Sequence, residues 1–212
     1  MSAAAVQVAG HGLTVTLPHP WEARLYLREA PPPDRHLGPD RQSDDRAHAE
    51  YLDDAQYLDD DERDGLLSAL RRRVDHPAGR GWPGELTHPV LHLANFSLPR
   101  GRGDFGTGAV EQMRPHHAFV SLFEYERSES GQALFATEGL PMPRAAEFSA
   151  SALQRRLAGQ GGWQRFFHQD GRAFCVYVVL GCLAQARAVV PEVRRVLEQV
   201  RIGDRTQLGA LL

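Results

Sequence analysis

The chain has 212 residues and a formal net charge of −3, and all 24 of its Lys and Arg residues are arginines. That length suits a single domain that buries its core without disulfides or metal, and the small net charge does not favour a nucleic-acid or membrane partner. The lack of lysine excludes Schiff-base chemistry, a lysine general base and the phosphate-binding lysine of a P-loop.

Two strands are predicted close to the N-terminus. Apolar and polar residues alternate over 12–17, where Pro18 and Pro20 end the pattern, and they alternate again over 21–27. This period of two is typical of strands with one buried face. The short His-Pro segment between the two strands indicates a tight connection.

The next segment differs in composition from the rest of the chain. Residues 34–64 hold twelve acidic residues and four arginines, a local net charge of −8, so the remainder carries +5. The tandem YLDDAQ and YLDDDE at 51–62 lacks the glycine and the oxygen spacing of an EF-hand loop. We therefore predict a solvated, partly disordered acidic insertion over 31–88, ending in a short helix over 64–74, within a single domain of residues 1–212.

The second half of the chain alternates predicted strands with short helices. Two strands flank Asp170-Gly171, a strong hairpin signal, and the second of them is apolar at almost every position over 174–180, as in a central strand. The other predicted elements are a strand over 89–99, one or two helical turns over 109–113, a strand over 117–126, a hairpin continued over 133–139, a helix over 148–159 and a closing helix with Pro191 in its first turn. Because hairpins dominate, we expect an α+β fold, an antiparallel sheet with helices packed on it.

The opening GLTVTLP with the following Trp21, the late hairpin into a long apolar strand, and the Pro-started closing helix with its VRI tail resemble the PsbP-like α/β/α sandwich. The mycobacterial lipoprotein LpqN family belongs to that fold, and the resemblance covers residues 11–29 and 89–202. The chain lacks a lipoprotein signal and carries the acidic insertion, and in this it is more similar to a group of cytoplasmic actinobacterial proteins. The resemblance implies a fold used for binding other proteins, without a shared catalytic site.

The stretch PRGRGDFGTG contains the G-x-G-x-x-G pattern at Gly101, Gly103 and Gly106. A dinucleotide-binding loop needs a long helix after the third glycine, within a parallel crossover. Here Pro115 ends any helix after a few residues, and an antiparallel-type strand follows. We therefore predict a flexible strand-exit loop that needs glycine for positive φ, and no cofactor.

Histidine and cysteine patterns do not indicate a metal or a nucleophile. The chain has no H-E-x-x-H and no C-x-x-C, so we predict no metal site. Cys175 and His168 could meet across the Asp170-Gly171 hairpin, but Cys175 lies in the most apolar strand, where a thiol becomes unreactive.

Two functions remain open. The first is a non-enzymatic cytoplasmic interaction module or accessory subunit of a larger assembly, predicted because the sequence shows no coherent catalytic set and carries an acidic insertion on an otherwise basic body. A cytoplasmic location is predicted because the N-terminus has no signal-peptide pattern and no segment has the length of a membrane span. Its predicted protein-binding residues are Asp53, Asp54, Asp59, Asp60, Asp61, Arg194 and Arg195. The alternative is a binder of small anions, or an enzyme, that uses the loop at 100–117. Its predicted ligand-binding residues are Arg100, Arg102, Gly103, Arg114 and His116.

Overall fold

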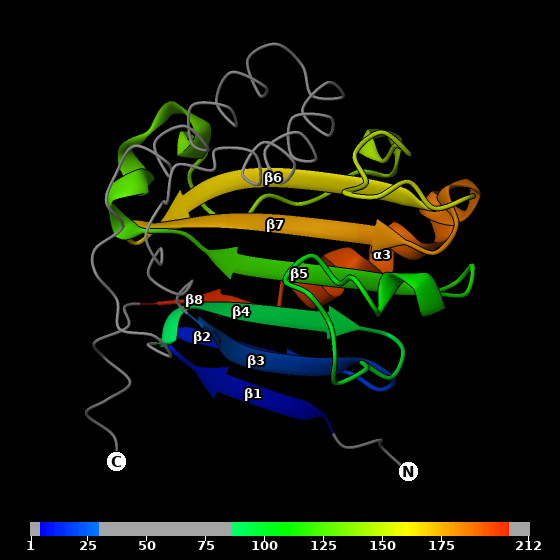
Figure 1. Cartoon of the computed structure of the whole chain (residues 1–212), viewed down its shortest axis with the longest axis horizontal. Helices are drawn as coiled ribbons and strands as arrows, with labels where there is room; N and C mark the ends of the chain where they lie inside the picture. The colour runs from blue at the N-terminus through cyan, green and yellow to red at the C-terminus, as the bar shows by residue number, and fades with distance from the viewer. Residues whose placement is uncertain (1–4, 30–85, 204–212) are drawn as a thin grey trace, which may run out of the picture. The chain divides into compact units, whose positions relative to one another are not determined.

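The structure is a computed structural model that describes residues 5–29 and 86–203 (Figure 1). The chain divides into two compact units, one of Met1–Tyr26 with His88–Leu212 and one of Leu27–Thr87. The acidic tandem and the predicted helix over 64–74 lie outside the described residues. None of the helices in the described part of the chain combines the length and the apolar character needed to cross a membrane.

A five-stranded sheet forms the centre of the fold, in the order β3-β4-β5-β7-β6. Its strands are β3 (Glu22–Glu29), β4 (Leu86–Ala94), β5 (Ala118–Glu124), β6 (Gly161–Gln169) and β7 (Arg172–Leu180). The pairs β4–β5, β5–β7 and β6–β7 are antiparallel. Every residue of β7 is buried, which confirms the predicted central strand, and Asp170 and Gly171 both have positive φ, which confirms the hairpin turn.

A second, three-stranded sheet has the order β1-β2-β8, with β1 (Val6–Gly10), β2 (Leu13–Leu17) and β8 (Arg201–Ile202). The strand β1 was not among the predicted elements. His11 and Gly12 have φ values of 51° and 75°, so β1 and β2 are joined by a two-residue turn in which both residues are left-handed.

The α-helix α3 (Ala186–Leu197) lies behind the five-stranded sheet in the view of Figure 1. Its buried valines join β2, β5 and β7 in one apolar cluster, so both sheets and the helix share a core. Five 3₁₀ turns complete the described elements: η1 (Val110–Gln112), η2 (Arg127–Gly131), η3 (Ala133–Phe135), η4 (Ala145–Glu147) and η5 (Leu183–Gln185). The α+β class, antiparallel sheets with a helix packed alongside, is thus confirmed, whereas the PsbP-like label stays a prediction.

Three predicted elements were wrong in detail. Residues 148–159 form turns instead of a helix, because the Ser149 hydroxyl accepts the Ala152 N–H and the neighbouring backbone bridges to Gly162. Residues 133–139 form η3 and a single bridge to His168 instead of a hairpin strand. The closing helix begins five residues before Pro191, whose ring is exposed and is tolerated inside the helix.

A buried ion pair within the five-stranded sheet also holds the arginine that reaches the second sheet. Arg172 on β7 donates from Nε and Nη2 to the Glu124 carboxylate on β5, at 2.9 and 2.7 Å, and both side chains are only 3% exposed. The same guanidinium donates to the His11 and Gly203 carbonyls, at 3.0 and 2.6 Å. Arg172 therefore fixes the β1–β2 turn against the five-stranded sheet.

Candidate functional site

The glycine loop, residues 99–108, is tied down at its centre. The Asp104 carbonyl accepts hydrogen bonds from His92 Nε2 at 2.8 Å and from the Ser121 hydroxyl at 2.6 Å, and both of these side chains are fully buried on neighbouring strands. The Asp104 carboxylate accepts a bond from the Tyr26 hydroxyl at 3.1 Å. The loop that was predicted to be flexible is thus attached to three strands of the sheet.

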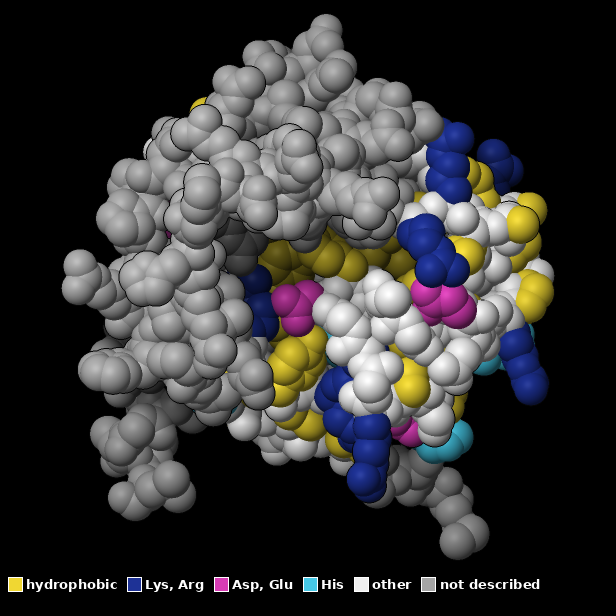
Figure 2. Space-filling model, viewed as in Figure 1, with side chains coloured by type: hydrophobic (Ala, Val, Ile, Leu, Met, Phe, Trp, Pro, Cys, Tyr) yellow, Lys and Arg dark blue, Asp and Glu magenta, His cyan; other side chains and the backbone are white. Residues whose placement is uncertain are grey.

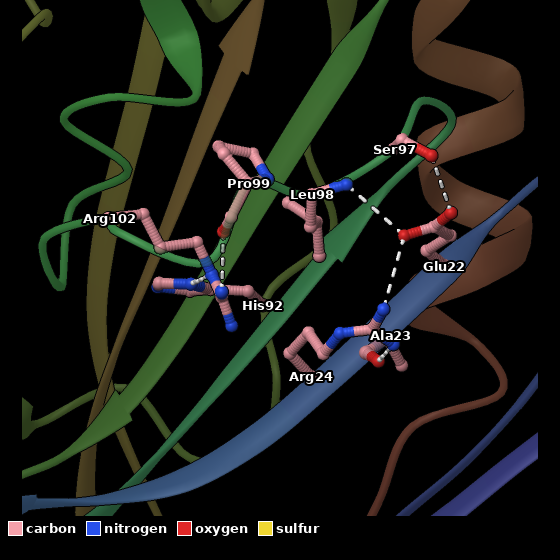
Figure 3. Close-up of polar contacts among 8 residues, drawn as sticks. All are labelled: Glu22, Ala23, Arg24, His92, Ser97, Leu98, Pro99 and Arg102. Carbon is pink, nitrogen blue, oxygen red and sulfur yellow. Dashed lines mark hydrogen bonds and ion pairs between the residues drawn. The ribbon is translucent and has the colours of Figure 1, made fainter.

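His92 orients Arg102. Arg102 donates from Nε to His92 Nδ1 at 2.8 Å and from Nη1 to the Pro99 carbonyl at 2.8 Å, as Figure 3 shows. Because Nδ1 accepts, the proton of the neutral ring is on Nε2, which donates to Asp104. Burial lowers the pKa of His92 to about 4; the bond to Asp104 opposes this shift and the charge of Arg102 adds to it. His92 is therefore a neutral structural residue near pH 7.

Only part of the G-x-G-x-x-G pattern is required by the backbone. Gly106 has a φ of 87°, and a Cβ there would lie 2.5 Å from the Phe119 ring. Gly101 has no atom within 4 Å of such a Cβ, and at Gly103 the nearest is Thr107 at 3.5 Å. Of the three glycines, only Gly106 is therefore required by close packing. The middle of the loop, at Asp104, is occupied by hydrogen bonds to the protein's own side chains.

The five predicted ligand-binding residues differ in their contacts. Arg102 is held by His92, whereas Arg100 is exposed, and the Gly103 N–H donates to Thr107. Burial lowers the pKa of Arg102, Tyr26 opposes the shift and Arg24 adds to it.

Arg114 and His116 are brought together beside His117. His117 Nδ1 accepts the Arg114 N–H at 3.0 Å, and the two imidazole rings lie 4.5 Å apart. Phe96 also stacks on the His117 ring, with ring centroids 4.7 Å apart. Burial, and then the nearby His116 and Arg114, lower the pKa of His117. The predicted ligand-binding residues therefore lie in two places: Arg102 contacts His92, whereas the exposed Arg114 and His116 lie beside the half-buried His117.

The other groups with reactive side chains have structural contacts. His168 lies opposite Ala173 and its Nδ1 is 2.6 Å from the Phe135 carbonyl, so it does not meet Cys175, which lies opposite Phe166. Burial raises the pKa of the Cys175 thiol. No group of three His, Cys, Asp or Glu side chains within residues 5–29 and 86–203 is arranged to hold a metal ion.

The predicted protein-binding residues can be placed only in part. Arg195 is exposed on α3, and Arg194 donates to the Pro143 carbonyl at 3.2 Å. The aspartates Asp53, Asp54, Asp59, Asp60 and Asp61 lie outside the described residues.

An aromatic cluster covers part of the sheet on the side away from α3. Tyr125 and Phe166 both pack against the buried Phe135 of η3, with ring centroids 5.2 and 5.6 Å from it. Figure 2 shows hydrophobic side chains on this side of the molecule, with arginine and acidic side chains near them. The rings of this aromatic cluster hold η3 against β6, so the cluster has a role in packing.

Three of the four sheet edges carry features that prevent pairing with another strand. The outer edge of β6 is covered by backbone bridges from Glu138 and Ser149. The edge strand β3 carries the charged Glu22 and Arg24, and β8 has only two residues. Short strands, charges and covering loops are the usual protections of an exposed edge.

Within the residues that the structure describes, the β1 edge has none of these protections. The sequence of β1, VQVAG, has no charge and no proline, and its only paired neighbour in the sheets of the described residues is β2. Val6 is 46% exposed and is the one large hydrophobic side chain that is exposed in this part of the chain. Sequence analysis missed this surface, although the uncharged VQVAG ahead of a His-Gly turn was a usable signal.

The hairpin register shows which backbone groups point outward. Gly10 pairs with Leu13 across the two-residue turn, so this pair exchanges both hydrogen bonds, as does every second pair along the ladder. The intervening residues Gln7 and Ala9 must therefore turn their N–H and C=O groups away from β2. Neither residue forms a hydrogen bond with the described part of the chain. Two donors and two acceptors thus lie in a row on an uncharged edge.

Comparisons of the chain with protein-family models, curated proteins and solved structures found no match.

Proposed function

We propose that this chain is a non-enzymatic interaction module that binds an extended segment of a partner protein by strand addition to β1. The observation that carries the proposal is the open β1 edge, with outward backbone groups at Gln7 and Ala9 and the exposed Val6 beside them. Main-chain hydrogen bonds to an added strand provide affinity, and side-chain contacts provide specificity.

The state of the polar side chains supports a binding role over catalysis. His92, His168 and Cys175 are engaged in contacts that hold loops or strands together. The unpaired thiols of Cys175 and Cys182 fit the reducing cytoplasm, which we include in the proposal. The PsbP-like resemblance, with its expectation of protein binding, points in the same direction.

One observation supports the alternative function, the binding of small anions. Arg102 is partly buried and has no carboxylate partner in the described residues, and Arg24 lies close enough to lower its pKa. Titration of inorganic phosphate and citrate into the chain tests this alternative, and binding that Arg102→Gln abolishes would support it.

Capture of host-cell proteins by the immobilised full chain tests strand addition when an edge variant is compared with a matched control. Ala9→Pro removes an outward N–H and leaves the β1–β2 bonds in place. Thr16→Lys, on the exposed face of β2, changes the surface one strand further in. We expect Ala9→Pro to lose a specific captured protein that Thr16→Lys retains. Capture that is equal for both variants and the unaltered chain would contradict the proposal.

A further inference from the structure

The β1 edge is complementary to itself. We infer that, in the absence of another strand, two copies of this chain pair through β1 in antiparallel orientation, and that this pairing covers the binding edge. The inference rests on the proposed function, because it concerns the same edge and names the strand that covers this edge when no partner protein is bound. Three properties of β1 favour a second copy as the added strand: its hydrogen-bond register, its lack of charge and its hydrophobic surface.

The hydrogen-bond register supports self-pairing. With a two-fold axis beside Val8, Gln7 of one copy lies opposite Ala9 of the second copy, and Ala9 lies opposite Gln7. These are the two residues whose N–H and C=O groups point outward. Each opposed pair exchanges two hydrogen bonds, so one register satisfies all the outward donors and acceptors of both copies, as an isologous interface requires.

The side chains fit the same register. Val6 would lie opposite Gly10 of the second copy, where the partly buried Leu25 packs against the glycine, 3.0 Å from the position that a Cβ would take. This places the one exposed large hydrophobic side chain of the described residues against apolar surface. No charge lies on β1, so antiparallel pairing brings no like charges together.

The other edges do not fit a second copy. The β3 edge would place charged side chains such as Glu22 and Arg24 at the junction, and the edge of β6 is already bridged by Glu138 and Ser149. Pairing through β1 would give a continuous six-stranded sheet in the order β8-β2-β1-β1-β2-β8 across the two copies.

Sedimentation of the purified full chain over a wide concentration range tests the inference without any other partner. We expect a reversible monomer–dimer equilibrium whose dissociation constant rises at least tenfold in Ala9→Pro. Val6→Lys, at a position that is 46% exposed in the single chain, should weaken the dimer in the same direction. Thr16→Lys is the matched control and should leave the dissociation constant unchanged.

Cross-linking tests the register itself. Val8 faces Val8 of the second copy in a pair without hydrogen bonds, whose Cα atoms are about 4.5 Å apart, within the range of a disulfide. In a Cys182→Ser background, Val8→Cys should form a disulfide-linked dimer on mild oxidation, whereas Thr16→Cys should not.

A chain that stays monomeric at every concentration, or a dimer that Ala9→Pro and Val6→Lys leave unchanged, would overturn self-pairing. The first of these results together with Ala9-dependent capture of a host protein would overturn only self-pairing and retain the proposed function. A β1-dependent dimer that captures no host protein through this edge would retain self-pairing and contradict the proposed function.

Discussion

The glycine loop and the β1 edge differ in what happens to their polar groups. The loop carries a recognisable motif, yet the Asp104 carbonyl at its centre is bound by His92 and Ser121. The β1 edge carries no motif, yet the backbone groups of Gln7 and Ala9 have no partner in the described part of the chain. Buried polar groups that are already satisfied hold a fold together, whereas exposed groups arranged in a row are available to bind. The contacts of a segment therefore say more about its role than its sequence pattern does.

The largest effect is expected at Arg172, which fixes the turn of the β1 hairpin. Arg172→Met removes the guanidinium that neutralises the buried Glu124 carboxylate, and this costs about 4 kcal/mol of the free energy of unfolding. Urea unfolding measures the loss. Arg155→Met, at a 69% exposed position, is the control and should cost less than about 1 kcal/mol. A small loss at Arg172 would show that the β1 hairpin is not anchored by this ion pair.

The next effect is the pH dependence that His92 gives to the loop. The pKa of His92 is about 4 in the folded chain and about 6.5 when unfolded, so the unfolded state binds more protons between these values. The neutral ring's contribution is complete above pH 6.5 and is lost as the pH falls towards 4, by about 3 kcal/mol in total.

Unfolding measured from pH 4 to pH 8 isolates this contribution when the unaltered chain is compared with His92→Phe. The difference in stability between the two proteins should shrink as the pH falls through this window, because carboxylate titrations are common to both. A difference that is constant with pH would mean that His92 is not buried as a neutral acceptor for Arg102.

Two glycines of the same motif should respond differently to one methyl group. Gly106→Ala forces a Cβ into the Phe119 ring at positive φ and should destabilise the chain by about 2 kcal/mol. Gly101→Ala meets no atom within 4 Å and should change stability by less than about 0.5 kcal/mol. Thermal unfolding of the two variants makes the comparison, and equal stabilities would show that the loop is not packed on β5.

The smallest change in stability is expected at the open edge. Ala9→Pro removes an N–H that has no partner in the described residues, so the free energy of unfolding should fall by less than about 1 kcal/mol. Val8→Pro removes a bond to Val15 within the hairpin and should cost clearly more. Chemical unfolding in dilute solution separates the two variants, and equal losses would place the outward groups on the wrong residues.

The hydrophobic pattern of the sequence correctly predicted those elements whose apolar side chains all pack into the core. The apolar run of β7 and the valine stripe of α3 are buried as their periodicity indicated. The segment at 148–159 misled because Phe148 and Leu153 pack into different clusters, which a helical pattern does not reveal.

The site was less accessible to prediction. Arg102 was identified as a candidate, but its contact with His92 joins a loop to a strand and depends on the fold. The strand β1 is short and lacks a long β-branched run, and an edge can be recognised as open only when its neighbours in the sheet are known.

Site-resolved amide exchange of the full chain in dilute solution tests most directly whether the β1 edge is open. The amide of Val8, bonded within the hairpin, should exchange slowly at every concentration. The amides of Gln7 and Ala9 should exchange rapidly when the chain is dilute and become protected when it is concentrated or bound to a partner. Slow exchange of Gln7 and Ala9 at high dilution would show that the edge is already occupied, and would contradict the account.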